Sequence, residues 1–111
     1  MMRQIKESDW KLFRQVHAEA LERFSQRILL EIELVNSDRT KGFHERYLEI
    51  WAVLKRRDKQ MAQAFDGIRR STALIQLASM KGLGVVTEDD IARFSQETRE
   101  VLGLMLRKGE P

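Results

Sequence analysis

The chain has 111 residues, of which 42% are apolar and 33% charged, and its net charge is +3. This length and balance predict one globular domain with a single modest core, and they exclude a largely disordered chain. The sequence contains no cysteine. That excludes disulfides, thiolate metal sites, iron–sulfur clusters and cysteine nucleophiles, and it fits a reducing cytoplasm.

The first predicted element is a long helix over residues 9–35, preceded by an N-terminal tail, residues 1–8. Ser8 is the predicted N-cap, because a serine side chain can accept a hydrogen bond from a free amide of the first turn. Apolar side chains recur through the segment at spacings of three and four, which is the helical period. The sequence therefore predicts one amphipathic helix of unusual length.

The end of this helix is apolar over much of its circumference, since six of the eight residues in 28–35 are apolar. A helix that packs on one core needs an apolar stripe only about 100° wide. The extra apolar surface predicts a second covering, and in a chain this small we expect a second copy to supply it. The residues predicted to form the interface of this homodimer are Leu29, Leu30 and Leu34.

A cluster of turn-forming residues over 36–42 separates the first helix from a second, predicted from Phe43 to Phe65. Asp66-Gly67 ends the second helix, because glycine adopts the left-handed C-terminal conformation easily. The two long helices are expected to form an antiparallel hairpin. The residues expected to be buried where they cross are Phe24, Trp51 and Leu54.

Three shorter helices are predicted after the hairpin, over about 72–81, from 88 onward, and over about 96–106. The predicted N-caps are Ser71, Thr87 and Ser95. Residues 107–111 are expected to fray. The predicted fold is an all-α single domain over 9–106, in which three C-terminal helices pack across a long antiparallel hairpin.

The positive charge is concentrated in the middle of the chain, where residues 37–70 hold nine basic and five acidic side chains. Such a cluster can mark a phosphate-rich partner, or it can be a solvated helix face. Asp58 interrupts the run, and few aromatic residues are interleaved with it. Nucleic acid is therefore possible but not favoured. The residues of this candidate anionic-partner patch are Lys55, Arg56, Arg57, Lys59, Arg69 and Arg70.

The two histidines carry no helical metal-binding spacing, because Leu21 and Leu48 stand four residues after His17 and His44. His17 lies on the apolar stripe and is predicted to be a core or boundary residue, and His44 is predicted to lie on the surface. No nucleophile elbow or dinucleotide-binding loop occurs. We therefore expect no catalytic residue, no metal site and no cofactor.

Three segments resemble a small family of uncharacterised proteobacterial proteins: residues 7–11 (ESDWK), 69–73 (RRSTA) and 93–99 (RFSQETR). The resemblance covers most of the chain. It implies a compact all-helical domain, and it implies no catalytic or binding residue, because none is assigned in that family.

These patterns favour a non-enzymatic, homodimeric interaction or regulatory module in the cytoplasm, with an unknown protein partner and an unknown pathway. A nucleic-acid-associated or ribosome-associated protein is the first alternative. An enzyme with a shallow site near His44 and Trp51 is the second. No membrane association is expected, because the longest apolar run, residues 101–106, is far shorter than the roughly 20 residues that span a bilayer.

Overall fold

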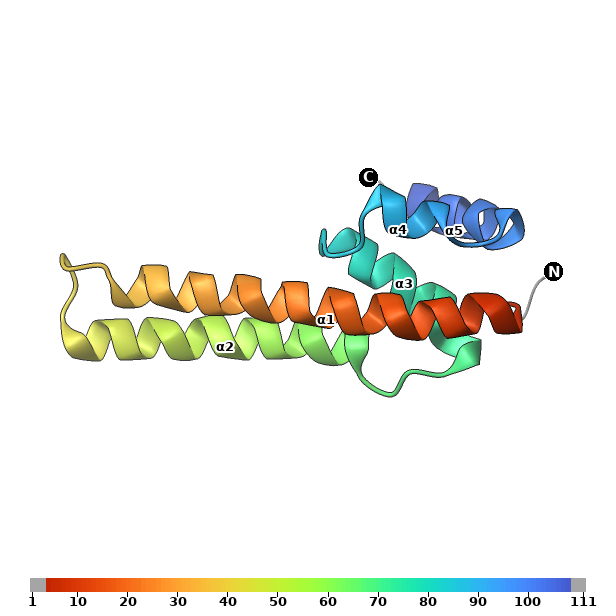
Figure 1. Ribbon diagram of the computed structural model, residues 1–111. Coiled ribbons are helices and arrows are strands. Elements are labelled where there is room, and N and C mark those ends of the chain that lie inside the picture. Colours follow the sequence, from red (N-terminus) through yellow and green to blue (C-terminus); the bar gives the residue numbers. More distant parts are fainter. Residues whose placement is uncertain (1–3, 109–111) are drawn as a thin grey trace.

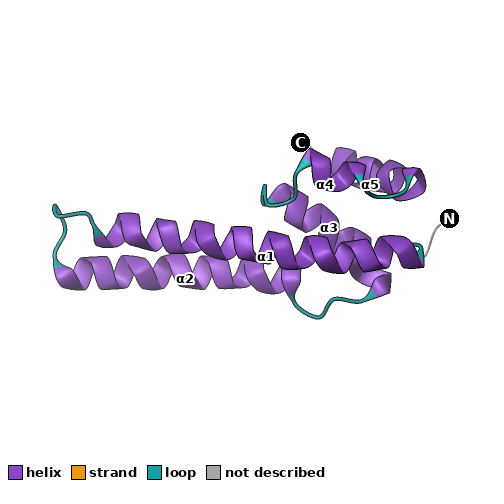
Figure 2. Cartoon of the chain, viewed as in Figure 1, coloured by secondary structure: helices purple, strands orange, loops and turns teal. Residues whose placement is uncertain are grey.

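The computed structural model describes residues 4–108, which form helices and loops without any strand (Figure 2). The prediction of an all-α protein is therefore confirmed. Two long helices, α1 (Glu7–Asn36) and α2 (Phe43–Phe65), lie side by side and run in opposite directions (Figure 1). Three short helices gather near the start of α1, and the molecule is elongated, with dimensions of 54 × 30 × 24 Å.

The start of α1 differs from the predicted one. The Lys6 carbonyl already accepts the amide of Trp10 at 2.8 Å, so the helix begins at Glu7 and Ser8 lies inside it. The prediction of Ser8 as N-cap is wrong. The entry of the chain is set by Ile5, which is buried in the core and whose carbonyl accepts a hydrogen bond from Arg70 at 2.8 Å. The described part of the predicted tail is thus partly core, and residues 1–3 lie outside the described range.

The connection between the long helices agrees with its prediction, and α2 has the predicted bounds. In the turn, the Asp38 carboxylate accepts hydrogen bonds from the amide and the hydroxyl of Thr40, at 3.0 and 2.6 Å. Arg46 of α2 is buried and donates to the carbonyl of Asn36, the last residue of α1. A cation is favourable at a helix C-terminus, so this contact ties the end of α1 to the start of α2.

The face of α2 that meets α1 is not the predicted one. Phe24 is buried, as predicted, but the prediction of burial is wrong for Trp51 and Leu54, whose exposed fractions are 57% and 41%. Val53 is buried instead.

The rotation of α2 has a polar cause. Arg46 and Arg57 turn toward α1 because each finds an oxygen there: the Asn36 carbonyl for Arg46 and the Glu31 carboxylate for Arg57, at 2.9 Å. Sequence periodicity counts arginines as outward residues, so it assigns the inward face to the next apolar stripe. The guanidinium partners on α1 place that stripe on the outside.

The remaining chain forms one short 3₁₀ turn and three helices. They are η1 (Arg70–Thr72), α3 (Ala73–Gly82), α4 (Glu88–Ala92) and α5 (Gln96–Lys108). Packing joins α3 to both long helices and to α5, so α3 is the central element of this end of the molecule. No helix within residues 4–108 is long and apolar enough to cross a membrane.

Two of the three predicted caps of the short helices agree with the structure. Thr87 forms a reciprocal capping box with Asp90, and the Ser95 hydroxyl accepts the amide of Thr98 at 3.3 Å. The predicted Ser71 cap is wrong, because Ser71 lies inside η1 and α3 begins after Thr72 without a side-chain cap. The helix α5 runs two residues past its predicted end.

The core lies where α3 meets the first two-thirds of α1 and the end of α2. Two phenylalanine rings, Phe24 of α1 and Phe65 of α2, stack with centroids 5.8 Å apart. The largest fully buried side chains of the described residues are Phe13, Phe24, Leu77, Met80, Leu102, Val16, Val85 and Thr98. None of these lies beyond residue 24 of α1 or anywhere in α2. The outer half of the hairpin therefore lies away from the well-packed core.

Candidate interaction surface

The outer half of the hairpin, residues 28–58, is here called the arm. It consists of two helices with no third element across most of their length (Figure 1). Ten large apolar side chains are exposed among the described residues, and all but Ile75 and Leu104 belong to the arm. The eight on the arm are Leu29, Leu30, Leu34, Phe43, Tyr47, Leu48, Trp51 and Leu54.

The three leucines predicted as a dimer interface are all on the surface, with exposed fractions of 60% for Leu29, 53% for Leu30 and 73% for Leu34. They do not form a single stripe. Leu30 and Leu34 continue the helical spacing of Arg23 and Arg27, the two arginines that contact the α3–α4 loop. Leu29 shares a surface depression with Leu30 and also lines the groove between α1 and α2. The apolar surface of α1 is therefore distributed around the helix.

An aromatic stripe on α2, formed by Phe43, Tyr47 and Trp51, is the larger part of this surface, and it includes Trp51, which was predicted to be buried. The Trp51 indole N–H donates to the Tyr47 hydroxyl at 3.0 Å, and the rings of Tyr47 and His44 stack with centroids 5.9 Å apart. The number of apolar residues in α2 is the sequence signal that could have indicated this exposed surface. With Phe43 and Leu48, α2 has more apolar residues than one buried stripe requires, as do the last turns of α1.

A shallow groove of about 270 Å³ joins the apolar surfaces of the two helices. Leu29 and Ile32 line it from α1, and Leu54 and Met61 line it from α2. Leu54 also lines a neighbouring surface depression together with Trp51. The apolar surface is therefore continuous from Leu29 across the groove to the aromatic stripe.

The basic cluster is partly neutralised within the chain. Arg56 and Arg57 both bind the Glu31 carboxylate, at 3.0 and 2.9 Å. The hydrogen bond from Arg57, with the charges of both arginines, holds the pKa of Glu31 below its usual value. Arg70 donates to a backbone carbonyl near the N-terminus.

The remaining members of the cluster, Lys55, Lys59 and Arg69, are exposed, and Asp58 lies between the two lysines. Phosphate binding depends on several cations that can turn to the same partner. Here half of the six candidate side chains already have partners inside the protein. Fewer cations of the cluster are therefore available to phosphates than the sequence suggested.

The histidines lie where they were predicted. His17 is partly buried, and its Nε2 is hydrogen-bonded to the Phe65 carbonyl at 2.9 Å. His44 is exposed on α2, and Tyr47 stands between it and Trp51. The predicted shallow enzyme site near His44 and Trp51 therefore consists of three solvent-facing rings, of which His44 and Tyr47 are stacked. Within residues 4–108, no three histidine or acidic side chains converge in a way that could hold a metal ion.

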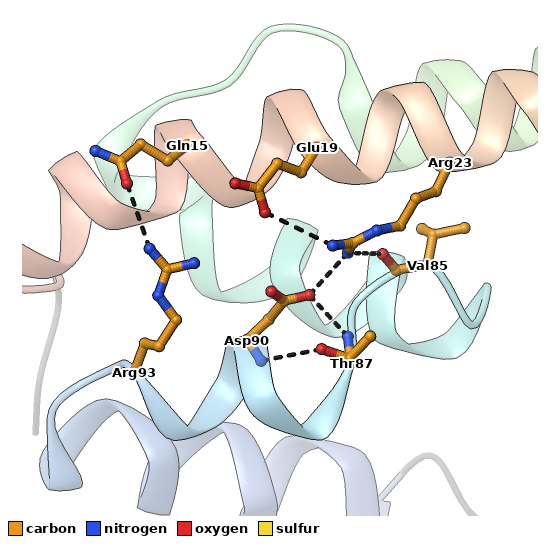
Figure 3. A network of polar contacts seen from close by, with 7 residues as sticks. All are labelled: Gln15, Glu19, Arg23, Val85, Thr87, Asp90 and Arg93. Atoms are coloured by element: carbon orange, nitrogen blue, oxygen red, sulfur yellow. Dashed lines mark hydrogen bonds and ion pairs between the residues drawn. The ribbon is translucent and has the colours of Figure 1, made fainter.

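Sequence reasoning missed a polar clamp that fastens the short helices to α1 (Figure 3). Arg23 donates from one nitrogen to the Val85 carbonyl at 3.0 Å and to the Asp90 carboxylate at 2.8 Å. The same carboxylate accepts the amide of Thr87 at 2.9 Å. Burial alone would raise the pKa of Asp90, but the hydrogen bonds from Thr87 and Arg23 outweigh it and lower the pKa. This clamp is structural, because its donors and acceptors are satisfied within the chain.

Replacing Asp90 by alanine should destabilise the protein by about 2–3 kcal/mol, since it removes both a helix cap and the buried partner of Arg23. Denaturant unfolding followed by circular dichroism measures this change. Asp89→Ala is the matched control, because Asp89 is exposed in the same helical turn. Its expected effect is within about 0.5 kcal/mol. Equal effects from the two variants would contradict the clamp.

In comparisons with known proteins, no family model, no curated protein and no solved structure matches this chain. The resemblance to a proteobacterial family stays a prediction. The function is therefore argued from the geometry of the arm.

Proposed function

We propose that this protein is a non-enzymatic interaction module that forms a homodimer through its arm. The observation that carries the proposal is the concentration of exposed large apolar side chains on residues 28–58. Two helices can bury only one stripe each against one another, and most helical stability in proteins comes from packing such faces. The arm has further apolar faces, and a contiguous apolar surface of this kind is typical of a binding site.

A second copy of the chain is the partner that this surface fits best. Two hairpins that pack side by side make a four-helix bundle, a stable arrangement in which each helix buries more than one face. A twofold axis achieves this with one self-complementary surface. Oligomerisation would also bury the arm without any further element from the same chain. The dimer would then present the short C-terminal helices of both copies to a protein partner.

Light scattering at micromolar concentration should give about twice the 13.1 kDa mass of the chain. Leu29→Glu places a charge in the groove surface and should convert the protein to a monomer, because an unpaired charge is strongly unfavourable in an apolar interface. Ile75→Glu is the matched control. Ile75 is equally exposed but lies on α3, outside the arm, so this variant should remain dimeric.

Circular dichroism should show that both variants keep the helical content of the parent protein. A parent protein that is monomeric throughout the micromolar range would refute the proposed function. Dissociation by Ile75→Glu as well would show that the contact lies elsewhere than the arm.

A further inference from the structure

The outer stripe of α2 has the spacing of a helix–helix seam. His44, Tyr47, Trp51, Leu54 and Asp58 follow one another at steps of three and four, the repeat by which two helices pack along their length. Two of the rings are linked in the free chain, because the indole of Trp51 donates a hydrogen bond to the Tyr47 hydroxyl. An ordered aromatic surface loses little conformational entropy when it is covered.

This stripe and the apolar side chains next to it, Phe43 on α2 and Leu29 across the groove on α1, are together large enough for a stable dimer. The side chains of Leu29, Phe43, Tyr47, Trp51 and Leu54 are between 41% and 84% exposed. With roughly 200 Å² for each large side chain, they present on the order of 600 Å² of apolar surface. A standard interface covers about 800 Å² per partner, of which about two-thirds is apolar in homodimers. The stripe therefore comes close to that need once Phe43 beside it and Leu29 across the groove are counted with it.

The charges along the stripe determine the orientation of the partner. Asp58 ends the stripe, and Lys55 and Lys59 border its C-terminal half around a shared depression, whereas Tyr47 and the adjacent Phe43 stand at its N-terminal half. Parallel pairing would place each charge beside the same charge of the other copy, which is unfavourable. Antiparallel pairing brings the lysine end of each copy to the aromatic end of the other, where cations are attracted.

The fold leaves this face open to a second copy. In Figure 1, α4 and α5 lie on the side of α1 that is away from α2, and α3 packs at the end of α2 remote from Phe43. An antiparallel arrangement also keeps the short helices of the two copies at opposite ends of the dimer. The packed end of one molecule therefore does not obstruct the other.

We infer that a second copy of this chain binds antiparallel along the outer stripe of α2, with the twofold axis close to Trp51. This inference rests on the proposed homodimer and specifies its geometry. Positions equally distant from Trp51 then face each other, so Tyr47 of one copy lies opposite Lys55 of the other. Within one chain, these two positions are eight residues apart, about 12 Å along the helix.

The absence of cysteine from the sequence makes this geometry directly measurable by disulfide formation. We would prepare Tyr47→Cys and Lys55→Cys separately and oxidise each alone and both in an equal mixture. A disulfide requires Cα atoms within about 7 Å. The mixture should yield a cross-linked dimer at least about ten-fold above either variant alone, because like positions lie too far apart across the axis.

A mixture of Leu34→Cys and Lys55→Cys is the control. Leu34 is exposed on α1 but lies outside the outer stripe and the groove, so this mixture should not form a cross-linked dimer. Light scattering on each reduced variant separates the possible failures. A dimeric mass without cross-linking of the mixture, or strong cross-linking of Tyr47→Cys alone, would overturn the antiparallel arrangement while the dimer stands. A monomeric mass for the parent protein would overturn both the arrangement and the proposed function.

Discussion

Phe24→Ala should destabilise the protein by about 3–5 kcal/mol, the cost of removing a fully buried phenylalanine together with the cavity that it leaves. The Phe24 side chain is only 1% exposed, and its ring stacks on Phe65 across the two long helices. A domain of this size has a total stability of about 5–15 kcal/mol, so the variant should be close to unfolding at moderate temperature. Denaturant titration followed by circular dichroism measures the loss.

Phe43→Ala is the control for this experiment because the chemical change is the same. Phe43 is 84% exposed, and the guanidinium carbon of Arg46 lies over its ring, 4.8 Å from the ring centroid. The free energy of unfolding should fall by less than about 1 kcal/mol in Phe43→Ala. The measurement is made at low protein concentration, where association contributes little to stability. A comparable loss in both variants would show that the rotation of α2 described above is wrong.

Asp9→Ala should destabilise the protein by about 2–4 kcal/mol, because Asp9 connects the first turn of α1 to the start of α5. Its carboxylate is buried and accepts three hydrogen bonds: from the Ser95 amide at 3.0 Å, the Ser95 hydroxyl at 2.6 Å and the Thr98 hydroxyl at 2.7 Å. Hydrogen bonds to a charged group are worth more than neutral ones, and the variant leaves these donors without their acceptor.

The same residue makes stability dependent on pH. Burial by itself raises the pKa of the Asp9 carboxyl. The hydrogen bonds from Ser95 and Thr98 and the charge of Lys6 lower this pKa by more than burial raises it, so the net shift is downward. A pKa below the unfolded value of about 3.9 means that the stabilisation is complete above that pH. It is lost as the pH falls through the folded-state pKa.

Unfolding free energies measured from neutral pH down to the acid transition should therefore fall less steeply for Asp9→Ala than for the parent protein. Glu7→Ala is the matched control, since Glu7 is an exposed carboxylate of the same helical turn. It should leave both the stability and the pH profile nearly unchanged. An unaltered acid transition in Asp9→Ala would contradict the role of the Asp9 carboxylate.

Local signals were sufficient to find the helices and most of their bounds, although the caps predicted at Ser8 and Ser71 are wrong. The apolar period and the turn cluster after Asn36 predicted α2 from Phe43 to Phe65, and the capping residues Thr87 and Ser95 predicted the starts of α4 and α5. These features depend on residues within one or two turns of each other, so they can be read from the chain. The excess of apolar residues near the end of α1 also predicted the exposed leucines of the arm.

Residues distant in the sequence decided which face of each helix is covered. The partners of Arg46 and Arg57 on α1 rotate α2 and place Trp51 on the surface, and no helical period contains that information. The hydrogen bond from the Ser95 amide to the Asp9 carboxylate joins positions 86 residues apart. A buried polar group must find a partner wherever the fold brings one, and those partners become known only when the tertiary structure places the helices together. The sequence by itself therefore determined the helices and the surplus of apolar surface, and tertiary contacts determined where that surface lies.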